Sequence, residues 1–141
     1  MAMGQVMLKE FLVDRKVPTA RASSRGRRTH GLGDGRMPEH YDAGTTTRRT
    51  ANLALLPTDH LDLHPADAAR LDVRDGTEVV VSSRRGRIQV GVQLTDEVLP
   101  GQVFPAFHFP DAAVNELTSG WTDDVTSCPE YKVTAVSVQP A

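Results

Sequence analysis

The feature that most constrains this chain is a pair of β-branched runs joined by a short polar turn. Residues 78–83 read EVVVSS, residues 87–94 read RIQVGVQL, and the turn between them contains Gly86. In the second run an apolar residue occupies every other position from Ile88 to Leu94. This period of two indicates a strand with one buried face, and two such runs around a glycine-containing turn predict a β-hairpin.

The remaining apolar segments predict a mainly β protein with short helices. Strands are expected where apolar or β-branched residues recur at short spacing, at residues 61–64, 102–107 and 131–138. Short helices are expected where helix formers lie beside a proline, at residues 50–56, 65–71 and 110–117. Sixteen valines against seven aromatic residues favour a small twisted barrel over a helical bundle, and no internal repeat is evident.

Charge is distributed unevenly along the chain. Residues 1–50 carry ten Lys/Arg and five Asp/Glu, whereas the rest of the chain carries six and thirteen. Residues 14–37 are basic and have only scattered apolar side chains, so most of this stretch cannot bury enough apolar surface to offset its ordering entropy. We therefore expect residues 1–34 to form a largely flexible basic arm, with at most one short element at 7–13, and residues 35–141 to form the ordered domain.

The basic arm leaves two kinds of partner open. An arginine-rich segment without interleaved aromatic residues binds phosphates through charge alone, which is typical of nonspecific nucleic-acid binding. The part of the chain after residue 50 has a net charge of −7 and would repel a polyanion. A solvated arm, or one that docks on an acidic protein, is therefore favoured over nucleic acid.

A single cysteine, Cys128, limits the chemistry that this chain can perform alone. It excludes an internal disulfide, a CxxC metal site and a cysteine-held iron–sulfur cluster within the chain. No apolar run reaches the length of a membrane span, and residues 1–13 lack a signal-like apolar run followed by a cleavage site. We therefore expect a soluble, cytoplasmic protein.

The densest polar cluster lies at residues 39–47, which read EHYDAGTTT. Gly44 followed by three threonines can present backbone N–H groups and hydroxyls to an anion such as a diphosphate. Arg48 and Arg49 add positive charge suited to phosphate oxygens. On spacing alone, the alternative of a polar loop that caps the helix beginning near Thr50 is favoured.

The histidines do not predict a metal site. His60 and His64 are four residues apart, but the leucines between them favour a strand, on which the two rings lie some distance apart. A surface or hydrogen-bonded role is therefore favoured for these side chains. No arrangement of Ser, His and Asp forms a recognisable nucleophile elbow, so we assign no catalytic residue and no metal ligand.

Four segments in a fixed order carry a resemblance to a known family: HYDAGT at 40–45, SRRG at 83–86, VNELT at 114–118 and PEYK at 129–132. Together they resemble the C-terminal dinucleotide-binding domain of molybdopterin oxidoreductases, most closely the formate dehydrogenase branch. The resemblance covers about residues 35–140. It implies a closed, six-stranded double-psi β-barrel and a bis-molybdopterin guanine dinucleotide cofactor, whose molybdenum or tungsten is held mainly by other domains.

The resemblance also assigns individual residues to the cofactor. The positions that it implies for contact with the pterin, the diphosphate and the rest of the pocket are Arg36, His40, Tyr41, Asp42, Gly44, Thr45, Phe107, His108, Asn115, Tyr131 and Lys132. Asn and His side chains supply the paired donors and acceptors that pterin and guanine edges need, and cations and N–H groups suit a diphosphate.

Two departures from the family pattern bear on function. In the family, an apolar first strand leads into a Gly-Arg motif, which corresponds to Gly35 and Arg36 here. In this chain the residues before Gly35 read SSRGRRTHGLGD. Either residues 7–13 supply that strand across a long loop, or the barrel is incomplete. The metal-ligating cysteine or selenocysteine and the cluster cysteines are also absent, and Cys128 does not occupy the ligand position. The chain thus resembles a domain or a separate small subunit that is inactive alone and is partnered by the remaining domains or catalytic subunit of a larger oxidoreductase.

An alternative function stays open from the sequence. In it the chain is a non-catalytic β-barrel interaction module, and its basic arm binds nucleic acid or an acidic protein partner.

Overall fold

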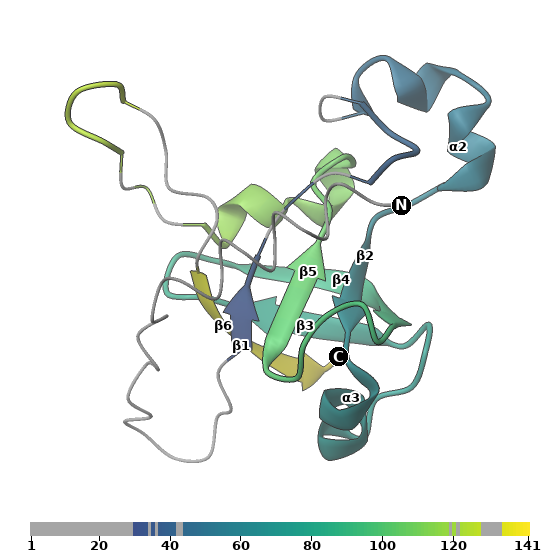
Figure 1. Cartoon of the computed structure of the whole chain (residues 1–141), viewed down its shortest axis with the longest axis vertical. Helices are drawn as coiled ribbons and strands as arrows, with labels where there is room; N and C mark the ends of the chain where they lie inside the picture. Colours follow the sequence, from purple (N-terminus) through teal and green to yellow (C-terminus); the bar gives the residue numbers. More distant parts are fainter. Residues whose placement is uncertain are drawn as a thin grey trace.

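The computed structural model describes residues 30–33, 35, 37–41, 44–118, 120, 122–127 and 134–141. Six strands close into a barrel in the order β1-β5-β2-β4-β3-β6 (Figure 1). The strands are β1 (His30–Leu32), β2 (His60–Leu63), β3 (Glu78–Ser82), β4 (Arg87–Leu94), β5 (Gln102–Pro105) and β6 (Thr134–Pro140). The helices of the described residues are η2 (Thr47–Arg49), α2 (Asn52–Leu55), α3 (Pro65–Leu71), η3 (Pro110–Ala112) and η4 (Val114–Glu116).

The strand order relates one half of the barrel to the other by a pseudo-two-fold axis. Exchanging β1 with β4, β2 with β5 and β3 with β6 leaves the circular order unchanged. It also preserves direction, because β1 runs parallel to β5 just as β4 runs parallel to β2, and the remaining pairs are antiparallel. Each half thus places one strand in parallel beside a strand of the other half. This is the double-psi β-barrel, and the expected fold class is confirmed.

The hairpin predicted from the β-branched runs is present as β3 and β4. Val79 faces Val90 and Val81 faces Ile88 across the pair, and all four side chains are buried. The same interior contains further apolar residues of the barrel strands, namely Leu32, Leu61, Leu63, Val92, Val103, Val136 and Val138. The barrel interior is therefore a packed aliphatic core, in keeping with the valine-rich composition.

The first strand lies in a stretch of the sequence that has no apolar pattern. β1 pairs with β5 on one side and β6 on the other, so neither expected alternative is right: the barrel is closed, and the strand is not at residues 7–13. The first strand of the barrel therefore precedes Gly35. Leu32 is buried in the core, and the buried His30 has its Nε2 4.0 Å from the Asp67 carboxylate on α3. Pairing with two neighbours specifies this strand, because its own β propensity is low. Residues 1–29 lie outside the described residues.

The short helices follow the expected positions, with one difference. Pro57 follows α2, and Pro65 occupies the first turn of α3 with the His64 side chain as its N-cap. The helical segment expected at 110–117 is instead two single 3₁₀ turns, because Ala113 between them adopts a left-handed conformation with φ of 47°. The last strand begins at Thr134, and residues 131–133 lie outside the described residues.

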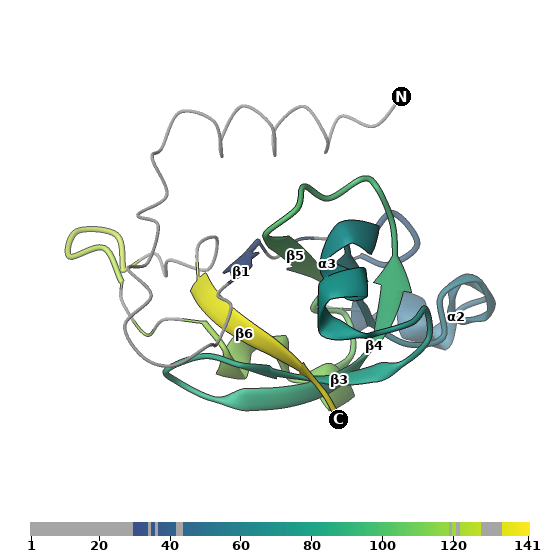
Figure 2. The ribbon, with the colours of Figure 1, turned by 90° about the horizontal axis from the view of Figure 1, so that it is seen from below.

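The two ends of the barrel are covered differently. Figures 1 and 2 show α3 at one end, whereas the loop that carries α2 and the segment that follows β5 both lie at the opposite end. In the part of the chain that the structure describes, no helix is long and apolar enough to cross a membrane.

Candidate functional site

The backbone that follows β1 runs along β5 to reach the end of the barrel opposite α3. Gly35 forms an isolated parallel bridge with Ala106, and a Cβ atom on this glycine would overlap the Phe104 ring. Two residues later the Met37 N–H donates to Nε2 of His108 over 2.8 Å. The N-terminal loop and the segment after β5 are thus joined at His108.

His108 lies where the N-terminal loop meets the segment after β5. Its side chain is fully buried, and because Nε2 accepts the Met37 N–H, the neutral ring carries its proton on Nδ1. The ring packs near those of His40 and Phe107, with centroid distances of 5.7 Å and 5.5 Å. Three rings from two distant segments therefore pack together here.

His40 organises the loop that precedes α2. Its ring is buried, and Nε2 lies 2.8 Å from the carbonyl oxygen of Leu56, which can only accept, so this nitrogen carries the proton. Nδ1 lies 2.9 Å from the hydroxyl of Thr47, and this hydroxyl oxygen also accepts the Tyr41 N–H over 3.1 Å. In the neutral ring, Nδ1 accepts the Thr47 O–H. Both imidazole nitrogens thus hold the loop closed on itself.

Gly44 lets the loop approach the segment after β5. Its φ of +66° is a left-handed conformation, and a Cβ atom there would lie 2.6 Å from the His108 carbonyl oxygen. Its own N–H donates to the Tyr41 carbonyl, and its carbonyl accepts from Nε of Arg48. A larger residue would separate the two segments, so glycine is required by both conformation and contact.

A buried carboxylate supports the same segment from the β2 side. Asp59 precedes β2, is 3% exposed, and accepts the Phe109 N–H on Oδ2 over 2.8 Å. Burial raises the pKa of Asp59 above its ordinary value, although the Phe109 N–H and the neighbouring His108 and His60 oppose that rise.

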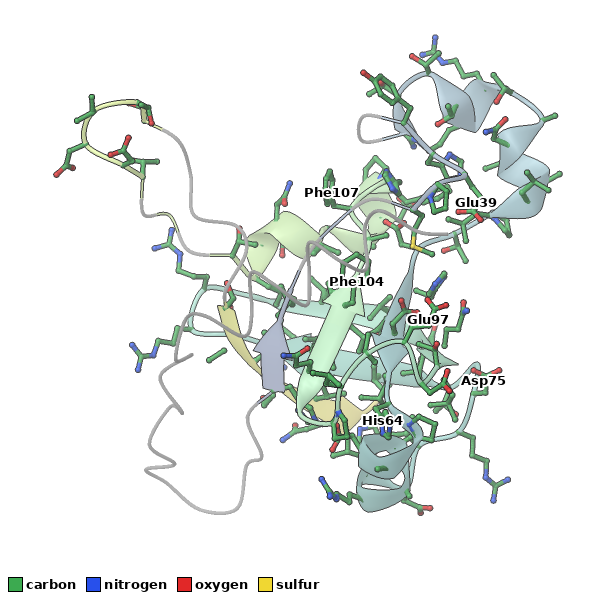
Figure 3. The ribbon with its side chains drawn as sticks, viewed as in Figure 1. Glu39, His64, Asp75, Glu97, Phe104 and Phe107 are labelled. Carbon is green, nitrogen blue, oxygen red and sulfur yellow. The ribbon has the colours of Figure 1, made fainter. Side chains whose placement is uncertain are left out.

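The outer surface of this assembly carries groups that a dinucleotide can use. Tyr41 is 67% exposed, Thr45 and Arg49 are exposed, and Phe107 is partly exposed. Figure 3 shows Phe107 at this end of the barrel, far from His64 at the α3 end. Aromatic faces stack on bases and pterins, while hydroxyls and a guanidinium bind phosphate oxygens. The described residues therefore fit a pterin dinucleotide.

The predicted site residues fall into three groups. The structure brings together the buried His40, Gly44 and His108 and leaves Tyr41, Thr45 and Phe107 on the surface above them. Asn115 is exposed on η4, where its carbonyl accepts the Thr118 hydroxyl, and its cofactor contact stays a prediction. The positions that lie outside the described residues, and whose roles stay predictions, are Arg36, Asp42, Tyr131 and Lys132.

Three supporting residues were not predicted. Asp59 and Phe109 gave no sequence signal, because an acid before a strand and an aromatic before a proline are ordinary surface patterns. Thr47 was part of the polar cluster, but its role is to hold His40 and Tyr41 rather than to face outward. Only the pairing of segments distant in sequence reveals these roles.

The histidines near β2 have hydrogen-bonded or paired roles. His60 Nε2 lies 3.3 Å from Asp62 Oδ1, and Nδ1 of His64 accepts the Ala66 N–H. No cluster of three or more His, Cys, Asp or Glu that could hold a metal ion occurs among the described residues. Cys128 lies outside them.

An open groove of about 580 Å³ on the side of the barrel is a poorer candidate. Its lining includes the acids Asp59, Asp75 and Glu78, and His60 is the one ionisable nitrogen among its lining side chains. A surface of this charge disfavours a diphosphate. The end of the barrel opposite α3, the loop end, is formed by the loop that carries α2 and the segment after β5. It is therefore the better site for an anionic dinucleotide.

Comparison with known proteins shows the family of the chain and the class of its ligand. A family model described as "Molydopterin dinucleotide binding domain" matches residues 32–135. The alpha subunit of F420-dependent formate dehydrogenase 1 of Methanococcus maripaludis is 36% identical over 130 residues, which is 92% of this chain and 19% of that protein. The corresponding alpha subunit of Methanocaldococcus jannaschii is 38% identical over 109 residues, 77% of this chain and 16% of that protein. The chain thus spans less than a fifth of the length of these curated relatives.

One solved structure supports the fold. The structure of acetylene hydratase from Pelobacter acetylenicus aligns with a TM-score of 0.69 at 14% identity, covering 79% of this chain and 18% of that one. At this identity the likeness concerns the barrel and not the chemistry. The sequence matches favour a cofactor-binding domain over the interaction module that the sequence had left open.

Proposed function

Because this chain belongs to the molybdopterin dinucleotide-binding domain family, we propose that it binds a molybdopterin guanine dinucleotide at the loop end of its barrel. It does so as part of a formate dehydrogenase-like molybdenum or tungsten oxidoreductase. The chain orients the cofactor, and residues elsewhere in the larger enzyme hold the metal. The named relatives, of which this chain spans less than a fifth, support this division of labour.

The observation that carries the proposal is the joint between the loop before α2 and the segment after β5. Buried His40 and His108 fix the two segments against each other. Tyr41 and Thr45 then lie on the outer surface of this joint. Rigid support beneath exposed polar and aromatic groups is what a preorganised ligand site requires.

Each exposed group has a proposed task. Thr45 and Arg49 bind diphosphate oxygens, and Tyr41 and Phe107 contact the flat faces of the pterin or guanine. The remaining proposed contacts come from Arg36, Asp42, Asn115, Tyr131 and Lys132, on the resemblance described above. When bound, the cofactor supplies a metal centre that accepts two electrons as formate is oxidised to carbon dioxide.

Guanosine monophosphate (GMP) is a fragment of the cofactor and tests the proposal directly. We expect millimolar GMP to shift the backbone amide signals of residues 37–48 and 106–109 of the ¹⁵N-labelled 141-residue chain. Adenosine monophosphate (AMP) is the control for the base, and signals of α3 at the opposite end are the internal control. A chain that gives no shifts in residues 37–48 at millimolar GMP contradicts the proposal. Equal shifts with AMP contradict the guanine assignment alone.

A further inference from the structure

Asp59 joins two parts of the molecule that are 50 residues apart in sequence. It directly precedes β2, and its Oδ2 accepts the Phe109 N–H over 2.8 Å. Phe109 follows the buried His108 and begins the turn that leads into η3. The carboxylate thus fixes the backbone of the segment that closes the loop end of the barrel.

The Asp59 carboxylate is buried, and its burial costs free energy. The side chain is 3% exposed, and its Oδ1 meets no donor at hydrogen-bond geometry among the residues that the structure describes, although the His108 backbone N–H also acts to lower the pKa of Asp59. Burying a carboxylate with an unsatisfied oxygen is unfavourable, and the raised pKa of Asp59 reflects that burial. The titratable groups that face it are the side chains of His108 from the segment after β5 and His60 from β2.

We propose that Asp59 is a positioning residue for the cofactor site, which holds residues 107–109 in place through the Phe109 N–H. The inference rests on the proposed function and adds a residue outside the set that the resemblance implies. Asp59 does not touch the ligand in this arrangement. It acts through the backbone that carries His108 and Phe107, which lie beneath and beside the proposed pterin surface.

Asp67 provides a matched comparison at the opposite end of the barrel. It is equally buried, and its Oδ2 accepts the Gly101 N–H. Its other oxygen is paired with Arg70 of the same helix over 3.0 Å. Both acids therefore fix a distant backbone N–H, but Asp67 does so far from the proposed ligand surface.

The test compares Asp59→Ala with Asp67→Ala in the 141-residue chain, using GMP as the probe. Asp59→Ala removes the acceptor of the Phe109 N–H, and loss of one such bond from a preorganised site corresponds to a decrease in affinity of up to about tenfold. We expect this decrease for Asp59→Ala and a change of less than about twofold for Asp67→Ala. Hydrogen exchange of the Phe109 amide should accelerate about tenfold in Asp59→Ala only.

Two further variants keep the test decisive. Asp59→Asn retains an acceptor oxygen and should restore most of the GMP affinity and the slow Phe109 exchange. If Asp59→Ala does not fold, Asp59→Leu fills the buried volume without an acceptor and should show the same loss.

The outcomes separate this inference from the proposed function. Equal loss of GMP affinity in the Asp59 and Asp67 variants means that Asp59 acts only through stability, and it overturns the inference. Unchanged Phe109 exchange in Asp59→Ala overturns it as well, whether or not GMP binds. Absence of GMP binding to the unmodified chain overturns the proposed function, and the Phe109 exchange still decides whether Asp59 fixes this segment.

Discussion

The two ends of the barrel have the same topology but differ in the backbone that covers them and in the polar groups beneath it. The connection from β2 to β3 contains α3, and its pseudo-symmetric counterpart from β5 to β6 contains η3 and η4. At the α3 end, a regular helix has a proline in its first turn, a capping side chain and paired ionisable groups. At the loop end, irregular backbone covers two buried imidazoles and a buried carboxylate.

This difference indicates which end of the pseudo-symmetric barrel is the better candidate for the ligand site. The α3 end satisfies its polar groups by ordinary capping and pairing, so it closes the barrel and does little else. Both ends bury polar groups, but at the α3 end Asp67 is paired with Arg70 of the same helix. At the loop end, buried His40 and His108 lie under an exposed loop and hold it in place. The end whose buried polar groups support an exposed loop is the better candidate for a ligand site.

The largest expected loss of stability comes from substituting Gly44, which lies where the loop before α2 contacts the segment after β5. Gly44→Ala introduces a Cβ atom against the His108 carbonyl in a left-handed conformation. We expect it to lower the free energy of unfolding by roughly 2–4 kcal/mol. Gly76→Ala is the control, because Gly76 also has a positive φ but would meet nothing within 4 Å, and about 1 kcal/mol is expected. Urea unfolding of both variants measures the difference, and equal losses would show that the contact with His108 is unimportant.

The next largest loss of stability is expected from substituting one of two histidines that accept backbone N–H groups at opposite ends of the barrel. His108→Leu leaves the partly buried Met37 N–H without an acceptor and should cost about 1–3 kcal/mol. His64→Leu removes the cap of α3 and should cost about 1 kcal/mol. Amide spectra should show changes at residues 37–48 for His108→Leu only. Changes there in both variants would mean that the two ends are not independent.

A smaller effect tests how the loop is held. Thr47→Val removes the hydroxyl that bonds both His40 and the Tyr41 N–H and should cost about 1–2 kcal/mol. Thr46→Val changes a neighbouring exposed threonine whose side chain does not cap η2, and its stability should stay within about 0.5 kcal/mol of the unmodified chain. Thermal or urea unfolding compares them. A Thr46→Val loss as large as that of Thr47→Val would contradict the assigned hydrogen bonds.

The smallest effect is a pH dependence at the loop end. The raised pKa of Asp59 means that the folded state binds this proton more tightly than the unfolded state. Its contribution to stability is therefore fully present below the ordinary value of 3.8 and is lost as the pH rises through the raised pKa. The stability of the unmodified chain relative to Asp59→Asn should thus decrease between pH 3.5 and pH 7. A difference that does not change with pH would mean that the pKa of Asp59 is not raised.

The sequence predicted the elements whose signals are local. The β3–β4 hairpin repeats its apolar pattern within one continuous segment, and α3 has its proline and helix formers in seven residues. The polar cluster at 39–47 was assigned to the cofactor only through the family resemblance, because its local pattern favoured a polar capping loop. For the hairpin and α3, the sequence signal and the structure occupy the same stretch of chain.

The rest could not be predicted because its causes are distant in sequence. β1 is a strand because β5 and β6 lie on either side of it, and its own sequence of His-Gly-Leu favours no sheet. Ala113 breaks the expected helix by taking a conformation that alanine rarely adopts. Asp59 is buried only because the segment after β5 covers it, and acids are otherwise surface residues.

The position of β1 has a consequence for how the chain folds as it is made. Its two neighbours are β5 and β6, and the register joins Leu32 to Thr134, at the far end of the described sequence. A ribosome synthesises β6 last among these strands, so β1 and β3 keep an unpaired edge until residues 134–140 have emerged. Closure of the barrel is therefore a late, long-range step, and a nascent chain that stalls before β6 exposes two edges that can pair with other chains.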